Sequence, residues 1–463
     1  MLRSGANHEP ASDAPACVAI YRPFFLAGML SVLTTGCLLG AVAMLGISLQ
    51  GSYTANGWSP YILAHANSQL YGWVGLFVMG VALQQHRPRL SRAKLFHCLA
   101  TCSLALVGLS IGLRFVAEPL VAQARSPWLW VGIASGVMQA VAVCLFVANI
   151  RLTRHRLRDP ATGAAAGLPW QSLFVFAALG WWMLVALAEP FVFALSHQAD
   201  RMQSVFFIAR WFVPYREAQF LGFVVNMIFG VALARLRSDF GVSAAYRRIG
   251  LAGFALWNLG LVARIAGWLW YFDAGMSAGS GSLYHIGGLL LAAGALWLVY
   301  SSRLFEPLAG ALPAHKFLRA AFGWLLLAGL LMLLEPWHLG QIGRPFSHAY
   351  TGAIRHALTV GFISQMIVGV SIYIVPRLRG IEPQAQRPLW AVFWLLNLGN
   401  ALRVAGEIIT DYTPASFLPM GVTGFIELAA LALWAVYLGR LILSSAPAAS
   451  IRQIGDVPSP RIA

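Results

Sequence analysis

Charged residues are scarce in this sequence. Only 10% of the 463 residues are Asp, Glu, Lys or Arg, whereas 59% are hydrophobic. Soluble domains carry roughly 25% charged residues, so a chain this apolar could not cover its surface in water. It requires lipid as a solvent, where only helices and closed barrels satisfy the backbone. Apolar runs of about 20 residues without strict alternation favour helices over barrel strands.

Paired cysteines are also missing. The five cysteines are Cys17, Cys37, Cys98, Cys102 and Cys144, and no two of them form a CxxC motif. This excludes a zinc site or a thioredoxin-like site of the usual spacing. A nucleophile triad, a phosphate-cradling loop and a dinucleotide fingerprint are absent as well.

Acidic residues are outnumbered by basic ones, which gives a formal net charge of +16. A soluble protein with this charge would suggest nucleic acid as a partner. Here the Lys and Arg residues cluster in alternate short loops, as the positive-inside rule describes. The basic stretches are 85–94, 151–170, 235–248, 303–319 and 377–387. We therefore expect no nucleic acid, membrane lipid as the surrounding partner, and both termini in the cytoplasm.

Hydropathy predicts an all-α polytopic membrane protein with about twelve transmembrane helices. The predicted single transmembrane domain covers 21–443, with cytoplasmic tails at 1–20 and 444–463. The longest irregular connection is expected at 196–216. The predicted spans are 24–49, 62–84, 95–117, 128–150, 171–195, 217–236, 247–271, 283–303, 317–337, 350–375, 389–410 and 416–443.

A glycine pattern occurs three times along the chain. Gly72, Gly222 and Gly361 occupy corresponding places in the second, sixth and tenth spans. In the spans that follow, 258–267 matches 397–406, since both contain Asn-Leu-Gly, then Arg, then Ala-Gly. Close helix packing alone could account for the glycines. The combined pattern predicts three pseudo-equivalent four-helix repeats, at about 24–150, 171–303 and 317–443.

Ionisable residues within the spans converge on one level of the membrane, toward the predicted outer face. Such residues are costly in lipid and usually mark a functional site. Glu407 follows Arg403 by one helical turn and is expected to pair with it. The residues of this polar layer are His65, Glu217, His348 and His356 on helices that run inward, and Arg114, Arg264 and Arg403 on helices that run outward.

Two of the histidines are suited to hold a haem. A neutral imidazole is a common haem ligand, and His65 and His356 lie on the second and tenth spans, which the repeat makes equivalent. His348 is the second candidate on the tenth span, about 12 Å from His356 along the helix axis, so the two cannot bind one metal together. His285, which begins the eighth span, could be a further metal ligand. Each histidine could instead be an interfacial residue bonded to a backbone carbonyl.

Arginines and one glutamate could complete such a site. Arg114, Arg264 and Arg403 could neutralise haem propionates or an anionic ligand. Glu217 could carry protons or accept a hydrogen bond. None of these assignments names a catalytic residue.

Three short motifs resemble the NnrS family. They are Tyr21-Arg-Pro-Phe-Phe-Leu-Ala27, His65-Ala66 with the glycines that follow it, and Arg355-His-Ala-Leu-Thr-Val-Gly361. The resemblance implies a twelve-helix protein of the bacterial inner membrane that carries haem and copper and takes part in the response to nitric oxide. It leaves open whether the protein would be a redox enzyme acting on nitric oxide, and it identifies no redox partner.

A more distant resemblance is to the catalytic subunits of heme-copper oxidases and nitric-oxide reductases. These have twelve helices in three sets of four, with metal-binding histidines on helices 2, 6, 7 and 10. His65 and His348 or His356 match two of those places, but helix 6 offers Glu217 and helix 7 has no histidine. A copper centre of the usual kind therefore lacks its imidazole ligands, and haem fits the sequence better than copper.

Two other classes of function fit the same sequence. Repeats and intramembrane charge pairs also occur in transporters and channels without a cofactor, although transporter repeats are typically twofold. A membrane scaffold or assembly factor would use the polar layer only to satisfy helix ends. Loss of a haem absorption band on changing His65 or His356 would separate the haem hypothesis from both.

Overall fold

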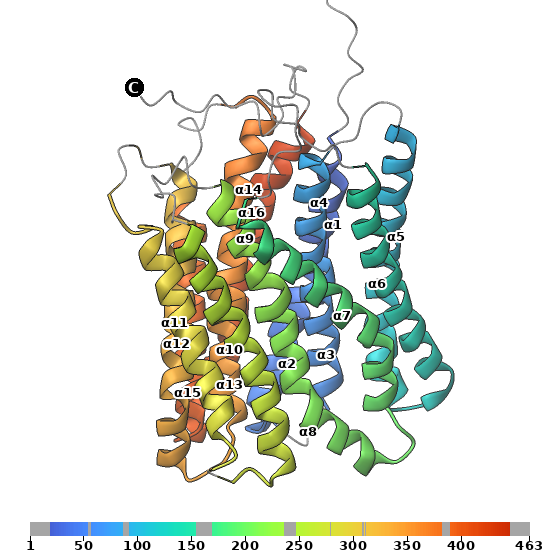
Figure 1. Ribbon diagram of the computed structural model, residues 1–463. Helices are drawn as coiled ribbons and strands as arrows, with labels where there is room; N and C mark the ends of the chain where they lie inside the picture. Colours follow the sequence, from blue (N-terminus) through green and yellow to red (C-terminus); the bar gives the residue numbers. More distant parts are fainter. Residues whose placement is uncertain are drawn as a thin grey trace, which may run out of the picture.

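The structure is a computed structural model of the whole chain, and its helices run side by side in one bundle (Figure 1). It describes residues 19–53, 57–86, 92–153, 169–235, 247–277, 279–307, 310, 312–381 and 389–444. Most of the predicted tails, the loops at 87–91 and 154–168, and Cys17 lie outside these residues. The described residues contain helices and no strand, so the predicted all-α class is confirmed.

Eleven helices of the described residues are long and apolar enough to cross a membrane. The first, Tyr21–Gln50, consists of α1 (Tyr21–Ser31), the π-helical η1 (Val32–Gly36) and α2 (Cys37–Gln50). Eight single helices are α5 (Ala93–Val121), α6 (Arg125–Thr153), α7 (Ser172–Ser196), α10 (Arg247–Asp273), α11 (Ser282–Ser301), α12 (Pro313–Ile342), α15 (Trp390–Thr410) and α16 (Phe417–Leu443), the last preceded by the short η7 (Pro414–Ser416).

Three long helices each contain a π-helical segment of eight residues. In order they are α3 (Ser59–Asn67), η2 (Ser68–Gly75) and α4 (Leu76–Gln85); α8 (Arg201–Glu217), η4 (Ala218–Val225) and α9 (Asn226–Arg235); and α13 (His348–His356), η5 (Ala357–Ser364) and α14 (Gln365–Leu378). The helix from Ser59 to Gln85 is not among the eleven apolar ones. The number of twelve spans therefore stays a prediction.

The sixth helix differs from the prediction. Residues 196–216 were expected to form an irregular connection, but α8 begins at Arg201 and continues into η4 without a break. The side chain of Asp200 accepts a hydrogen bond from the backbone N–H of Met202 at 2.8 Å and caps the helix. Arginines interrupt the apolar pattern of this segment, which is why the hydropathy pattern placed the start of the helix too late.

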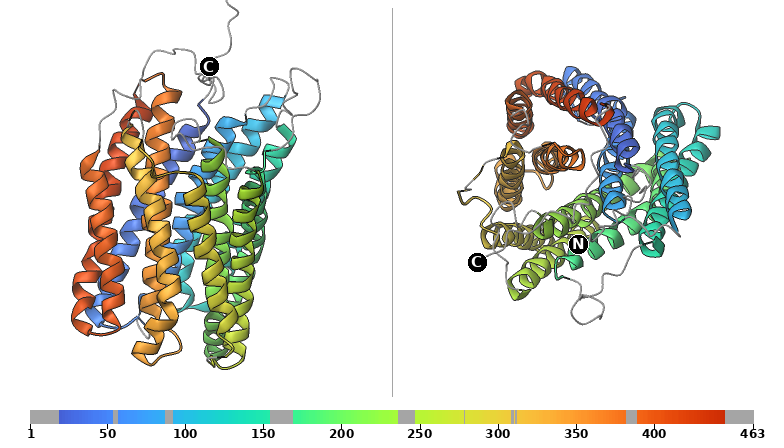
Figure 2. Two further views of the ribbon diagram at one scale, coloured as in Figure 1. Left: turned by 60° about the vertical axis from the view of Figure 1, so that its left-hand side comes forward. Right: turned by 90° about the horizontal axis from the view of Figure 1, so that it is seen from above.

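The helices that carry the π-helical segments form the inside of the bundle. Seen from above, α14 lies within a ring of other helices (Figure 2). Among the membrane-spanning candidates, Arg201–Ala234 and His348–Leu378 are the most buried, at 78% and 72% of their apolar windows. Each π-helical segment packs on the long helix before it, namely η2 on α1, η4 on α7 and η5 on α12. Residues at the start of these π-helical segments therefore lie in the interior of the bundle.

The predicted glycine correspondence falls at one position of the three π-helical segments. Gly72, Gly222 and Gly361 are each the fifth of eight residues. A Cβ on Gly222 would lie 2.7 Å from Trp181 Cγ, and one on Gly361 would lie 2.5 Å from Trp324 Cγ. These glycines are therefore needed for close approach of the neighbouring helix.

Candidate cofactor site

The residue directly before each π-helical segment is polar. These residues are Asn67 before η2, Glu217 before η4 and His356 before η5. Each lies beside a buried arginine with a carboxylate partner, so the interior contains three separate polar clusters. All three are in the part of the bundle where α3, α8 and α13 lie, away from the end where α1 begins (Figure 1).

The cluster around Arg264 on α10 joins four helices. Its Nε lies 2.6 Å from Glu217 Oε1, and a terminal nitrogen lies 3.0 Å from Glu335 Oε2 on α12. The same nitrogen donates to the hydroxyl of Tyr284 at 2.5 Å, and the guanidinium lies 3.9 Å from the centre of that ring. Two carboxylates therefore neutralise this arginine completely.

The cluster around Arg114 on α5 has the same character. Arg114 lies 2.7 Å from Glu118 and 3.0 Å from Glu189 of α7. The amide of Asn67 donates to Glu189 Oε1 at 3.2 Å, and the hydroxyl of Tyr215 donates to the other oxygen of that carboxylate. Glu118 and Glu189 are buried, so this arginine also has a full complement of negative charge.

The third cluster contains a histidine. Arg403 on α15 lies 3.2 Å from Glu407, as the spacing of the two residues predicted. The second oxygen of Glu407 lies 3.0 Å from His356 Nδ1. Glu407 therefore connects the arginine with the imidazole, and α15 with α13.

These contacts define what the three predicted arginines do in the folded chain. Arg403 is an electrostatic neighbour of His65 and shares Glu407 with His356. Each of the three arginines is paired with at least one glutamate within 3.2 Å. Pairing lowers the cost of a charge in the membrane interior, which is at least about 2.5 kcal/mol for an arginine at a helix centre. Their charges are thus compensated within the protein.

His65 is held at one nitrogen and open at the other. Its Nδ1 lies 2.9 Å from the carbonyl oxygen of Gly36, the last residue of η1. The ring packs so closely on Gly40 that a Cβ there would lie 2.5 Å from it. No hydrogen-bond partner of Nε2 occurs among the described residues. The imidazole therefore has a fixed orientation and a free lone-pair position.

His356 has the same arrangement. Its Nδ1 lies 3.0 Å from the carbonyl oxygen of Gly352 and 3.0 Å from Glu407 Oε2. Its side chain is 26% exposed although it lies in one of the most buried helices, and Nε2 has no partner in the part of the chain that the structure describes. His356, Arg403 and Arg216 lie near enough to His65 to act on it electrostatically.

The other interior histidines differ from this pair. His338 uses both ring nitrogens, for Asp411 at 2.8 Å and for Tyr412 at 3.1 Å. His197 likewise contacts the carbonyl oxygen of Phe193 at 2.9 Å and Glu118 at 3.3 Å. Histidines with both nitrogens occupied serve as cross-links between helices.

The two remaining candidate ligands lie at helix starts. His348 is the first residue of α13, is exposed, and packs edge-on against Phe346. His285 lies in the first turn of α11, and its buried Nδ1 has no hydrogen-bond partner among the described residues. Neither histidine shares the Nδ1 anchoring of His65 and His356.

The anchoring at Nδ1 bears on metal binding. Histidines that bind metals usually donate their other ring N–H to a carbonyl or a carboxylate, which fixes the tautomer and leaves Nε2 for the metal. His65 and His356 meet this condition on two different helices. Over the described ranges, no group of three or more His, Cys, Asp or Glu side chains is arranged to hold a metal ion. Haem, which needs one or two axial ligands, thus fits the donors better than a copper ion bound only by protein.

Two further arginines, which were not predicted as site residues, lie in the same region. Arg216 and Arg355 each precede the polar residue that begins a π-helical segment, and both are partly buried. The glycine alignment contained this signal, since each arginine stands six residues before its glycine. Tyr284 and Glu118 were also missed; Glu118 has the same spacing from Arg114 as Glu407 has from Arg403.

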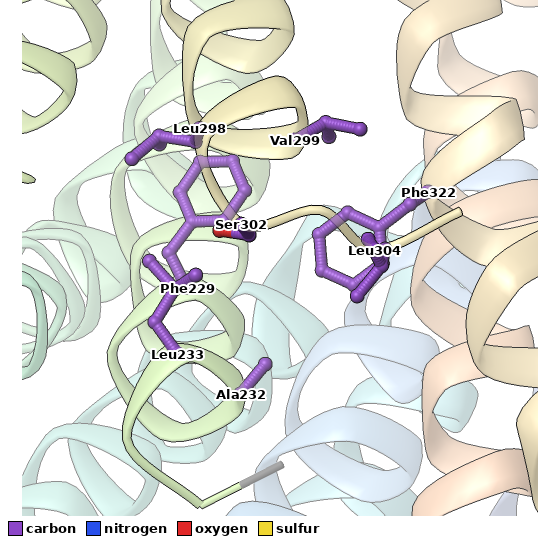
Figure 3. A pocket seen from close by; sticks show the side chains of 8 residues that line it. All are labelled: Phe229, Ala232, Leu233, Leu298, Val299, Ser302, Leu304 and Phe322. Carbon is purple, nitrogen blue, oxygen red and sulfur yellow. The ribbon is translucent and has the colours of Figure 1, made fainter. Parts of the chain in front are cut away.

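An apolar pocket lies elsewhere in the bundle, between α9, α11 and α12 (Figure 3). Its lining contains one polar residue, Ser302, among apolar side chains that include Phe229, Leu298 and Phe322. Leu298 is about 21 Å from Tyr284 along the axis of α11. Because the pocket has no titratable lining residue and is far from the polar clusters, it is not part of the candidate site.

One protein family matches part of the chain. The family described as a domain of unknown function (DUF8744) matches residues 314–440. This stretch begins in α12 and ends in α16. No curated protein matches the chain.

Proposed function

We propose that this chain is a haem-binding integral membrane protein of the NnrS type, with His65 and His356 as axial ligands. The proposal includes the bacterial inner membrane as its location, with both termini in the cytoplasm, and a part in the response to nitric oxide. It combines the geometry of the two imidazoles with the resemblance of the Tyr21–Ala27, His65 and Arg355–Gly361 motifs.

The observation that carries the proposal is the matched state of the two imidazoles. Both are held at Nδ1, by Gly36 and by Gly352 with Glu407, and both are open at Nε2. His338, by contrast, uses both ring nitrogens for contacts within the protein. An imidazole that is held at Nδ1 and open at Nε2 is available to a metal.

Haem would add the chemistry that the side chains lack. When bound, its iron supplies a centre that takes nitric oxide or changes oxidation state. The chain's own residues would orient the two imidazoles and exclude water. Copper is retained only as an implication of the family resemblance.

We also propose that the fold consists of three pseudo-equivalent four-helix repeats. The three π-helical segments support this, since each has glycine as its fifth residue. Asn258 exchanges hydrogen bonds with Asn226 at 3.2 Å, and Asn397 does so with Gln365 at 2.7 and 3.3 Å. Asn258 and Asn397 are the residues that the sequence alignment made equivalent. The family match to 314–440 covers nearly the same stretch as the predicted third repeat.

The test is an optical spectrum of the purified protein. Protein produced with ample haem is purified in detergent, and its reduced-minus-oxidised spectrum and iron content are measured. We expect a Soret band that is lost or shifted in His65→Ala and in His356→Ala. His348→Ala is the matched control, because it removes an exposed histidine from the same helix and should leave the band unchanged.

The other outcomes have definite meanings. A band that survives both substitutions but is lost in His348→Ala or His285→Ala would move the ligands to those helix starts. A protein without haem or metal would contradict the proposal. The open imidazoles would then favour a cofactor-free transporter, in which the same substitutions alter flux.

A further inference from the structure

Arg216 and Arg355 occupy corresponding positions on neighbouring interior helices. Arg216 is the residue before Glu217, and Arg355 is the residue before His356. The π-helical segments that follow them, η4 and η5, are in contact. The two guanidinium groups are close enough to act on each other electrostatically. Two positive charges are therefore brought together inside the bundle.

Neither arginine has the carboxylate partner that the other three buried arginines have. Arg216 donates to Gln219 Oε1 at 2.7 Å, and the rings of Phe212 and Tyr215 lie 5.9 Å from its guanidinium. The side chain of Arg355 makes no hydrogen bond or ion pair with any described residue. Like charges without a counter-ion repel each other and are unfavourable in a medium of low polarity.

The charges around Arg355 do not cancel. Its electrostatic neighbours are Arg216, Arg264, Glu217 and Tyr284. Glu217 is the single carboxylate among them, and it already forms an ion pair with Arg264 at 2.6 Å. Glu335 also pairs with Arg264 at 3.0 Å. The three arginines Arg216, Arg264 and Arg355 thus face two carboxylates, and one positive charge is left, which an anion could neutralise.

Unused hydrogen-bonding atoms lie next to this pair. The side-chain nitrogen of Gln219 is buried and has no partner, although its oxygen accepts from Arg216. The second oxygen of Glu217 is also buried without a partner, but this oxygen is an acceptor and a carboxylate ligand could not satisfy it. Buried polar groups are nearly always satisfied in a complete protein. The side-chain amide N–H of Gln219, a buried donor next to Arg216, is thus available to a bound anion.

We propose that Arg216 and Arg355 form a binding site for carboxylate groups in the interior of the bundle, beside His65. Arginine has a planar fork of donors that matches a carboxylate, and two arginines can hold two carboxylates. Arg216 is also an electrostatic neighbour of His65. The two carboxylates can come from the propionates of a haem, in which case the inference rests on the proposed function, or from a free small dicarboxylate.

The first arm of the test compares two porphyrins on the full-length protein. Protein purified from haem-deficient cells is titrated with haem and with haem dimethyl ester, which lacks the propionate charges. We expect haem to bind at least about tenfold more tightly than its ester, with most of that preference lost in Arg216→Gln and in Arg355→Gln. Arg210→Gln is the matched control, because Arg210 lies on the same helix, is partly exposed and pairs with Asp273 at 2.7 Å.

The second arm needs no haem. The thermal unfolding of the haem-free protein is followed with succinate and with chloride at equal ionic strength. A free dicarboxylate would raise the unfolding temperature of the unaltered protein and of Arg210→Gln, but not that of the Arg216 and Arg355 variants. The comparison of the two porphyrins on unaltered protein stands even where a variant fails to fold.

The two arms separate the failures. Equal affinity for haem and its ester, with no response to succinate, would overturn the carboxylate site and leave the haem proposal standing. A succinate response in a protein that binds neither porphyrin would support the site and contradict the haem proposal. Binding of neither porphyrin, without a succinate response, would overturn both.

Discussion

Glu407 holds His356 in place: its Oε2 atom lies 3.0 Å from Nδ1 of the imidazole. The other oxygen of the same carboxylate lies 3.2 Å from Arg403. A carboxylate at this nitrogen makes a metal-bound imidazole more basic and fixes its ring plane. The contact gives Glu407 a defined effect on any metal at His356.

We predict that Glu407→Gln lowers the affinity for haem by about tenfold or more. The neutral amide keeps a hydrogen-bond acceptor for His356 but removes the negative charge that stabilises the oxidised iron. The reduction potential of the haem should therefore rise. A spectroscopic redox titration of the purified protein measures this change.

Glu427→Gln is the control for that experiment. Glu427 is also buried, lies on α16, and contacts no histidine among the hydrogen bonds of the described chain. Because Glu427 acts on His356 electrostatically but makes no hydrogen bond to it, this variant should raise the potential less than Glu407→Gln does. Equal shifts of the reduction potential in the two variants would mean that Glu407 acts only through its negative charge and not through its contact with His356.

Gly40 lies against the ring of His65 and limits how this proposed haem ligand can be oriented. Gly40→Ala would place a methyl group 2.5 Å from the ring of His65. The ring would have to turn away from the carbonyl of Gly36, so we expect a shifted Soret band and a lower haem content. The haem-to-protein ratio of the purified variant measures the effect.

Gly108→Ala provides the comparison within the membrane. A Cβ on Gly108 of α5 would meet no atom within 4 Å, and alanine favours a helix more than glycine does. This variant should keep its haem and its stability. If it loses haem to the same extent as Gly40→Ala, the crowding of His65 is not the cause.

The proposed orientation can be tested with reporter fusions. A fluorescent protein fused after the last residue should fold in the cytoplasm and fluoresce, whereas alkaline phosphatase at that point should be inactive. When either reporter is inserted beside Arg344, between α12 and α13, the fluorescent protein should not fluoresce and the phosphatase should be active. Active phosphatase at the C-terminus would reverse the orientation derived from the positive charges.

Hydropathy and spacing predicted most of the fold. Apolar runs located the helices because the membrane requires each to be continuous and apolar. The start of α8 at Arg201 was missed because its arginines look like loop residues until the helices around them are known. The π-helical segments were not predicted either, since the extra residue in a turn leaves no pattern in hydropathy.

The site was predictable in part. The level of His65, His356 and the arginines followed from helix direction, and the pair of Arg403 and Glu407 followed from their spacing. Contacts between helices did not follow, such as that of Tyr284 with Arg264, because they depend on how the bundle packs. The state of each histidine nitrogen is also a property of packing alone.

A substitution of Arg264 distinguishes two roles of a buried arginine: counter-ion of buried glutamates, or ligand of a haem propionate. If Arg264 is mainly an internal counter-ion, Arg264→Gln leaves Glu217 and Glu335 in the interior without their ion-pair partner. Breaking a buried ion pair typically costs about 3–5 kcal/mol, so we expect a large fall in thermal stability whether or not haem is present. The double variant Arg264→Gln with Glu335→Gln should lose less than the sum of the two single variants, because it removes a pair in contact. Arg210→Gln, which breaks a partly exposed pair, should have no measurable effect. A variant Arg264→Gln that keeps its stability and loses only haem would show instead that this arginine binds a propionate.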